Sequence, residues 1–368
     1  TLVFYCIQMY QNTVLCMRFY NNINTINEYL CDMRTYVDDS IYHMEQFIRV
    51  NRYKKNYSAF CVTTEQYKET LQNFSEELTS IKPFSPSLMK ITEIGYLLKC
   101  FYRLHDNKDY EKALKYSFGF NGYLDNLFGV FENLEKGNIN VSEFNCNKSS
   151  KIEKEYYPPL LESNPIKNDC DLTQNIIITG PNGSGKTTML KTITINIIFT
   201  QQLGTGFYKK CILNPYTRIF SYLNIPDTSN YDSLFQAEAR RCKQILDDIH
   251  SYPEKDGHRH FYIFDEVFSG TSPRQAENLI YSYLSYVCNF NNVNFCITSH
   301  HIKACKKLKK LKKIKNYKMI VKEVGDCVLE YTYKMKPGIS SVEGSISVLK
   351  QLDYPEEIIQ RNQEEEKS

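Results

Sequence analysis

One run of eight residues has the composition and spacing of a loop that holds phosphate groups: Gly180, Pro181, Asn182, Gly183, Ser184, Gly185, Lys186 and Thr187. Its small glycines let successive backbone N–H groups close around phosphate oxygens, and a helix that starts there adds a partial positive charge. We expect Lys186 to reach the β- and γ-phosphates of a nucleotide and Thr187 to hold Mg²⁺, with Thr188 lining the same site. A glycine-rich turn without a ligand is the alternative.

Two acidic residues, Asp265 and Glu266, follow directly after the apolar run at residues 260–264. Because a buried charge is costly without a partner, two carboxylates at the end of a buried strand favour a metal-assisted site. In nucleotide hydrolysis the first carboxylate holds Mg²⁺, and the second positions or deprotonates the attacking water. Asp265 is therefore predicted to be a metal ligand, and Glu266 is predicted to be catalytic.

A third apolar run, at residues 295–298, leads into His300 and His301. A histidine at the end of such a strand can hydrogen-bond the γ-phosphate or organise the attacking water. An ordinary surface histidine is the alternative.

The elements that would position these groups alternate between strands and helices. Short β-type runs are separated by helical stretches and lie at residues 176–179, 211–213, 260–264 and 294–298. Two further runs, 319–324 and 327–333, flank Gly325-Asp326 and predict an antiparallel hairpin. Alternation with a phosphate loop predicts an α/β fold with a mainly parallel sheet flanked by helices.

The first 150 residues carry helical spacing instead. One apolar stripe predicts a first helix, which Pro83 and Pro86 would end: Tyr67, Leu71, Phe74, Leu78 and Ile81. A second stripe predicts the next helix: Leu88, Ile91, Ile94, Leu97, Phe101 and Leu104. A third helical stretch is expected at about residues 109–134.

A polar segment at residues 136–154 has little periodicity and is the expected connection between two domains. We therefore predict an all-α domain at residues 1–150 and an α/β domain at residues 151–362. A charged tail is expected at residues 363–368.

The composition is that of an ordinary globular chain of 368 residues, with 42% hydrophobic residues and a net charge of +3. Any nucleic-acid binding must therefore come from local patches of charge. Thirteen scattered cysteines without a CxxC pair argue against a zinc ribbon and a disulfide framework. They predict a reducing, intracellular compartment, which could be the cytoplasm, the nucleus or a viral replication site.

The start of the chain and two polar clusters have simple interpretations. Polar residues interrupt the first twenty residues, so we expect neither a membrane span nor a signal peptide, and Thr1 in place of Met is expected of a fragment or a trimmed chain. His258 and His260 lack the companions of a metal site and are expected in a solvated loop. Apolar residues at every third position of the lysine-rich run 306–315 could face the sheet, which would leave the lysines in water; a phosphate-backbone patch is the alternative.

Several motifs, in the same order along the chain, resemble those of the MutS family, the mismatch-repair branch of the ABC-type ATPases. The segment at residues 265–272 is similar to the family's Asp-Glu-x-x-x-Gly-Thr-Ser. Five other segments resemble family motifs: Gln202-Leu203-Gly204, Arg218-Ile219-Phe220, Ser233-Leu234-Phe235-Gln236-Ala237-Glu238, Ser299-His300 and Pro337-Gly338-Ile339-Ser340. The resemblance covers about residues 150–362.

The resemblance implies an ABC-type P-loop ATPase domain preceded by an all-α core and lever domain. It implies that Gln202 and His300 sense the γ-phosphate, and that Ser233 meets ATP bound to the opposite subunit. The implied cofactors are ATP and Mg²⁺. The implied partners are double-stranded DNA and a second subunit, which would form a homodimer or a MutS-like heterodimer. No membrane partner is implied. The implied process is mismatch repair or DNA maintenance.

Some positions depart from the family pattern. Pro165-Ile166 stand where the family has the aromatic residue that backs adenine. The Gly-x-Phe-Tyr-Glu wedge of mismatch sensors is not found, and Phe74 of a lone Phe-x-Glu falls on the apolar face of a predicted helix. Two alternatives remain: a MutS relative without mismatch recognition that acts on branched DNA or an assembly such as the ribosome, and a weakly catalytic scaffold. A transporter ATPase is disfavoured because its Leu-Ser-Gly-Gly-Gln signature is absent.

Overall fold

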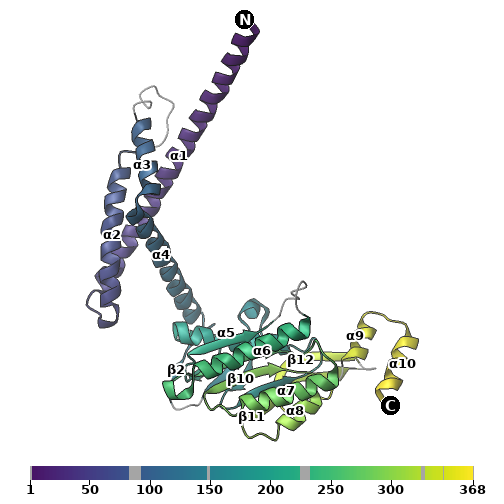
Figure 1. Cartoon of the computed structure of the whole chain (residues 1–368). Helices are drawn as coiled ribbons and strands as arrows, with labels where there is room; N and C mark the ends of the chain where they lie inside the picture. The colour runs from purple at the N-terminus through teal and green to yellow at the C-terminus, as the bar shows by residue number, and fades with distance from the viewer. Residues whose placement is uncertain are drawn as a thin grey trace. The chain divides into compact units, whose positions relative to one another are not determined.

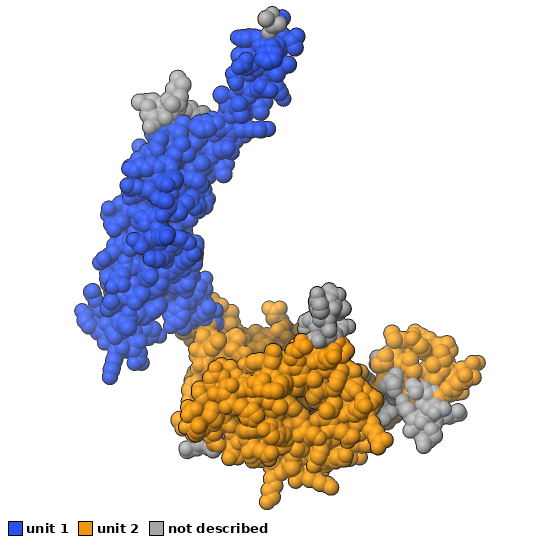
Figure 2. Space-filling model, viewed as in Figure 1, with its two compact units in different colours: residues 1–129 blue, residues 130–368 orange. Residues whose placement is uncertain are grey.

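The computed structural model describes residues 2–82, 93–146, 150–223, 233–324, 328–342 and 344–367. The chain forms two compact units, residues 1–129 and 130–368, which Figure 2 colours separately. The two prolines expected to end the first helix, Leu88 and Ile91 of the second stripe, and the predicted turn Gly325-Asp326 lie outside the described residues.

Unit 1 is helical, as its spacing predicts. Its elements are α1 (Leu2–Asn51), a 3₁₀ turn (Lys55–Tyr57), α2 (Ser58–Leu78), α3 (Ile94–Asp106) and the start of α4 (Lys108–Glu135). Leu71, Phe74 and Leu78 of the predicted first stripe are buried in one apolar core with Leu97 and Leu104 of the second. The stripes therefore pack against each other and hold the helices together.

The main sheet of unit 2 has six strands in the order β12-β11-β5-β10-β9-β8. Their bounds are β5 (Asn175–Thr179), β8 (Arg218–Tyr222), β9 (His260–Asp265), β10 (Val293–Thr298), β11 (Ile314–Val324) and β12 (Val328–Pro337). Figure 1 labels β10, β11 and β12 of this sheet. All neighbours pair in parallel except β11 and β12, which form the predicted antiparallel hairpin. The prediction of a helical part followed by an α/β part with a mainly parallel sheet is confirmed.

Side chains that alternate along the strands of the main sheet pack into two separate hydrophobic cores, one on each face. In β9, Tyr262 and Phe264 face a core built with α6 (Leu234–Ser251), α7 (Pro273–Val287) and α8 (Ile302–Leu308). Phe261 and Ile263 face the other core, which contains α5 (Lys186–Leu203). Because both faces are covered, the strands are apolar throughout, as buried parallel strands are.

Two small sheets pack beside α5. One joins β1 (Asn140–Val141) to β6 (Thr205–Gly206), and the other has the order β2-β7-β3-β4, with β2 (Glu143–Phe144), β3 (Lys151–Glu155), β4 (Asn168–Asp171) and β7 (Lys210–Leu213). The segment that we expected to connect two domains thus supplies strands to unit 2, and the predicted strand at residues 211–213 pairs outside the main sheet. Short polar strands lack the apolar alternation that sequence analysis detects.

The remaining elements are the 3₁₀ segments Pro158–Ser163 and Glu254–Asp256, and the C-terminal helices α9 (Ser345–Gln351) and α10 (Glu356–Lys367). Among the helices that the structure describes, none combines the length and the apolar character that crossing a bilayer would need. The twelve cysteines within the described ranges are reduced thiols.

Candidate functional site

The loops that carry the predicted catalytic residues leave the same edge of the main sheet. Thr298 on β10 pairs with Ile178 on β5 and with Asp265 on β9, so the carboxyl ends of these three parallel strands lie level. The phosphate loop after β5, the carboxylates after β9 and the histidines after β10 therefore meet at one place. Ligands of open α/β sheets bind at this kind of edge.

The loop after β5 folds back so that its residues surround the side chain of Lys186. Gly183 and Gly185 have φ angles of 75° and 92°, a left-handed backbone that side chains disfavour. Helix α5 begins at the next residue, Lys186, whose side chain is only 5% exposed. The Nζ of Lys186 donates a hydrogen bond to the carbonyl of Pro181 at 3.2 Å. This geometry places the ammonium group and the positive end of α5 beside each other.

The interior of this loop is tight and polar. A Cβ atom at Gly180 would lie 2.8 Å from Oγ of Ser184, so no larger residue fits there without movement. The Ser184 hydroxyl is buried and has no hydrogen-bond partner among the described residues. A buried hydroxyl without a partner is unfavourable, and an anion in the loop would relieve it.

Two oxygen-bearing side chains lie together where a metal is predicted. Oγ1 of Thr187 donates to the Asp265 carboxylate, at 3.0 Å from Oδ2 and 3.2 Å from Oδ1. The hydroxyl of Thr298 also donates to Oδ1 of Asp265 and orients the carboxylate. Hydroxyl and carboxylate oxygens suit Mg²⁺, which keeps several waters as its other ligands. In the described part of the chain, no cluster of three or more His, Cys, Asp or Glu residues offers another metal site.

Glu266 is held between two cationic or hydrogen-bonding groups. Its Oε1 lies 2.6 Å from Nε2 of His300 and 3.6 Å from Nζ of Lys186. The hydrogen bond from His300 is the main cause that lowers the pKa of Glu266 below 4.5, against the opposing effect of its partial burial. His301 lies next to His300, but its own pKa is lowered by burial. His300 therefore takes the position beside the carboxylate.

The backbone supports this arrangement. Glu266 has a φ of 50°, which is unusual for a residue with a side chain and costs about 1–3 kcal/mol. Its N–H donates to the carbonyl and the hydroxyl oxygen of Thr298 at 3.3 and 3.2 Å. Burial lowers the pKa of Lys186, while Glu266 and Asp265 oppose that shift. The ammonium group of Lys186 is thus partly desolvated and lies near the acidic side chains of Glu266 and Asp265.

Ser233 caps the N-terminus of α6. It forms a capping box with Gln236, whose backbone N–H lies 3.3 Å from Oγ of Ser233. Further along α6, the buried Glu238 accepts hydrogen bonds from the N–H groups of Ser269 and Gly270 at 3.0 and 3.2 Å. Glu238 thus ties α6 to the loop that follows the two carboxylates. The sequence motif contains Glu238, but only the structure reveals this contact.

The structure does not bring Gln202 to this site. Gln202 is exposed near the last turn of α5, and Lys186 is the first residue of the same helix. At about 1.5 Å per residue, the two lie roughly 24 Å apart along the helix axis. The neighbouring Gln201 bonds the backbone of Tyr216. Within one chain, Gln202 therefore lies away from Lys186 and the glycine-rich loop.

A pocket of about 270 Å³ lies beside the phosphate loop. Gly185 and Thr188 form part of its wall, together with Pro165, Ile166 and Tyr333. A Cβ atom at Gly185 would lie 3.1 Å from Cδ1 of Tyr333, so the ring packs directly on the glycine. Tyr333 has a φ of 54° and lies within an irregularity in the pairing of β11 with β12, because Val321 pairs with Tyr331 and Ile320 with Lys334. Such an irregularity changes the direction of a side chain. Sequence analysis missed this residue because nothing in its local pattern sets it apart from other tyrosines.

A second and more open pocket, of about 730 Å³, lies on the other side of the loop. Its wall includes Pro181 and Asn182 of the loop, Ser299 and His300 after β10, and Gly344 before α9. The predicted loop and histidine residues therefore line one continuous surface.

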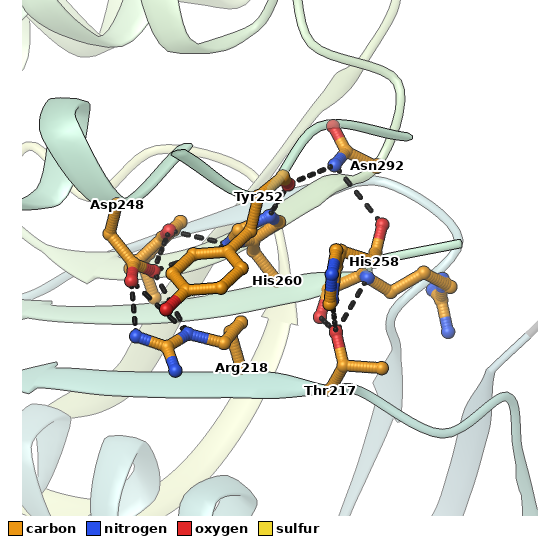
Figure 3. A network of polar contacts seen from close by, with 9 residues as sticks. Thr217, Arg218, Asp248, Tyr252, His258, His260 and Asn292 are labelled. Atoms are coloured by element: carbon orange, nitrogen blue, oxygen red, sulfur yellow. Dashed lines mark hydrogen bonds and ion pairs between the residues drawn. The ribbon is translucent and has the colours of Figure 1, made fainter. Parts of the chain in front are cut away.

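A buried polar network anchors the opposite edge of β8 and β9 (Figure 3). Asp248 on α6 pairs with Arg218 on β8 and accepts a hydrogen bond of 2.9 Å from the hydroxyl of Tyr262. The fully buried His260 lies 2.7 Å from the Tyr262 hydroxyl and from the Tyr252 carbonyl. The expectation of a solvated loop is wrong for His260, because the residue begins β9 and packs under this network.

Comparison with known proteins places these features in a family. The family description MutS domain V matches residues 176–368, which is more than half of the chain. A curated protein called DNA mismatch repair protein MutS, from Staphylococcus haemolyticus (strain JCSC1435), is 26% identical over 311 residues, which cover 80% of this chain and 34% of that protein. The protein of the same name from Staphylococcus aureus (strain MRSA252) has the same identity and coverage. The chain spans about a third of the length of these relatives.

Proposed function

The chain belongs to the MutS family, and on that premise we propose that unit 2 is a P-loop ATPase that hydrolyses ATP at a dimer interface and couples hydrolysis to the binding of double-stranded DNA. The observation that carries the proposal is the meeting of Lys186, Asp265 and Glu266 at one edge of a parallel sheet. Glu266 lies within ion-pair reach of Lys186 and within hydrogen-bond reach of His300. A site for phosphoryl transfer needs these positioning and electrostatic elements.

Each residue has a distinct part in the proposed reaction. Backbone N–H groups of the loop and the Lys186 ammonium bind the phosphates and offset their charge. The oxygens of Thr187 and Asp265 hold Mg²⁺, which supplies charge stabilisation to the transferring phosphoryl group when bound. Glu266 orients or deprotonates the attacking water; the lowered pKa of its side chain favours the ionised form, which accepts a hydrogen bond from that water. His300 fixes the Glu266 carboxylate and contacts the γ-phosphate.

The pocket beside Gly185 is the proposed position of the adenine base. Tyr333 offers an exposed aromatic ring directly next to the phosphate loop, and Pro165 and Ile166 add apolar walls. An aromatic ring supports a base by stacking, which the two apolar residues cannot do. Tyr333 would thus supply the aromatic contact that the sequence did not reveal.

Dimer formation gives Ser233 its proposed role. The exposed N-terminus of α6 provides a serine hydroxyl and the positive end of a helix dipole, a combination that suits a phosphate. We propose that it meets ATP of the opposite subunit. Glu238 and its contacts to Ser269 and Gly270 link this helix end to the catalytic loop within one chain.

A second candidate is a MutS relative that acts on branched DNA, or on another assembly such as the ribosome, without reading mismatches. The observation in its favour concerns Phe74, the phenylalanine of the lone Phe-x-Glu sequence. Phe74 is 1% exposed inside the core of unit 1, so it cannot stack into a duplex.

Steady-state ATPase assays on the full chain test both candidates. The wild type, Glu266→Gln and the exposed control Glu153→Gln are compared without DNA and with homoduplex, mismatched and branched DNA. Stimulation by one DNA that is lost only in Glu266→Gln supports the coupled ATPase and identifies its substrate. If the rate of hydrolysis is the same with and without every DNA, a partner other than DNA is favoured. If the folded wild type hydrolyses no ATP, the proposed ATPase activity is contradicted.

A further inference from the structure

A dense group of lysines covers α8 and the turn that follows it. Six of them are exposed and together form what we call the lysine cluster: Lys303, Lys306, Lys307, Lys309, Lys310 and Lys312. They lie within ten residues of one another, whereas the whole chain has a net charge of only +3. The positive charge of this surface is therefore local.

The fold holds the cluster on one side by burying the residues between the lysines. Leu308 is fully buried, Ile314 is 6% exposed, and Leu311 packs against the same core. This confirms that the apolar residues at every third position face inward. The lysines are thereby presented together on a rigid element and are not spread along a flexible tail.

The cluster lacks carboxylate partners within the described residues, since none of its six lysines forms an ion pair there. The two lysines that follow it differ. Nζ of Lys313 donates to the Cys288 carbonyl at 2.8 Å, and Lys315 pairs with Asp171 at 3.0 Å. Like charges three and four positions apart on a helix repel each other. The fold thus uses the last two lysines for its own contacts and leaves the six lysines of the cluster exposed.

We propose that the lysine cluster binds the phosphate backbone of duplex DNA. This inference rests on the DNA binding in the proposed function and identifies a surface for it. Duplex DNA carries about one negative charge per 1.7 Å of its axis, and lysines that neutralise phosphates gain free energy by releasing counterions. The cluster presents ammonium groups on a helix and a turn, and its apolar side chains face the core. It therefore offers charge to a polyanion without an apolar anchor for a membrane.

The chemistry of the cluster predicts contact without sequence reading. Lysine presents a point charge and lacks the planar fork with which arginine grips a base or a phosphate. Backbone contacts position a protein on the duplex and carry no sequence information. Helix α8 begins at Ile302, two residues after His300, so DNA bound at the cluster acts on the same segment that carries a catalytic side chain.

The test measures DNA binding as a function of salt. We compare the full chain with a variant in which Lys306, Lys307, Lys309 and Lys310 are replaced by Gln. A control variant carries the same change of charge at four exposed lysines on or beside β3 and β7: Lys151, Lys154, Lys209 and Lys210. Fluorescence anisotropy with a labelled homoduplex of about 30 base pairs gives the affinity at each salt concentration. Thermal unfolding and ATPase activity without DNA are recorded for each protein.

The cluster variant should bind DNA more weakly, and the slope of log K against log salt should decrease by about 0.9 for each lost contact, or by about 3.6 at most. Homoduplex and mismatched duplex should lose equal affinity, and ATPase activity without DNA should remain. An unchanged slope in the cluster variant would overturn the proposal, as would an equal loss in both variants. Binding to anionic vesicles but not to duplex would also overturn it. If the wild type itself has no ATPase activity, the proposed function is refuted instead.

Discussion

The side chains of His300 and Glu266 are joined by a hydrogen bond of 2.6 Å between Nε2 and Oε1. Because a carboxylate can only accept, Nε2 of His300 carries the proton. Lys186 lies 3.6 Å from the same Oε1 atom on the other side. The Glu266 carboxylate is thus held by residues from the loops after two other strands, which restricts its orientation before any substrate binds.

Replacement of His300 should impair hydrolysis and change its pH dependence. We expect His300→Ala to lower kcat by about 10²-fold, because the carboxylate loses its orientation. The hydrogen bond from His300 lowers the pKa of Glu266, so its removal should raise that pKa. Glu266 must be ionised to act, and the acidic limb of the pH–rate profile should therefore move to higher pH. His301→Ala is the matched control, and an unmoved limb in His300→Ala would contradict the assignment.

Thr187 should control the dependence of activity on Mg²⁺. Thr187→Val keeps the shape of the side chain but removes the hydroxyl that lies 3.0 Å from Asp265. We expect the Mg²⁺ concentration for half-maximal activity to rise by about tenfold, which corresponds to about 1.4 kcal/mol. Thr187→Ser restores the hydroxyl and should behave like the wild type. Equal Mg²⁺ dependence in Val and Ser variants would exclude Thr187 as a ligand.

Tyr333 should matter for the base and not for the phosphates. Stacking of a base on an aromatic ring contributes about 1–3 kcal/mol, so Tyr333→Ala should raise the Kd for ATP by about tenfold. Tyr333→Phe keeps the ring and should keep the affinity. Calorimetry with inorganic tripolyphosphate provides the control, because its binding should be the same in all three proteins. If Tyr333→Ala binds ATP normally, the base lies elsewhere.

Asp248 should stabilise the fold away from the catalytic edge. Burial acts to raise its pKa, but hydrogen bonds from Arg218 and Tyr262 outweigh burial and lower it below 3.8. The resulting stabilisation is present above pH 3.8 and is lost as the pH falls through the lowered pKa. Asp248→Asn should reduce the free energy of unfolding by about 2 kcal/mol near neutral pH. Urea denaturation measures it, with Asp247→Asn on the exposed side of α6 as control; equal values for the two variants would refute the role.

Glu155 should destabilise the fold as the pH rises. The side chain is fully buried, and burial raises its pKa from 4.5 to about 8. The folded state therefore holds a proton that the unfolded state has released, and the free energy of unfolding falls between pH 4.5 and about 8. Glu155→Gln cannot ionise, so its stability relative to the wild type should increase across that range. The exposed neighbour variant Glu153→Gln should show no such trend, and a constant difference for Glu155→Gln would contradict the pKa.

Local patterns in the sequence were enough to predict the main elements of this fold. Each of these patterns spans only a few consecutive residues or helical turns. Examples are the spacing of glycines around Lys186, the two carboxylates after an apolar run, and the stripes through Phe74 and Leu97. Helical and strand periods dictate which side chains share a face, so such patterns can be read without knowledge of distant contacts. They correctly predicted the helical first part, the α/β second part and the hairpin at β11 and β12.

Which distant residues lie beside the candidate site depends on contacts that no local pattern contains. Tyr333 packs on Gly185 because a hairpin folds back beside the phosphate loop, and Glu238 reaches Ser269 because α6 packs along the sheet. Gln202 has a suitable side chain, yet the rigid rise of α5 carries it away from Lys186. Local periodicity sets the direction of a side chain along its own element, but strand order and helix packing set its distance from everything else.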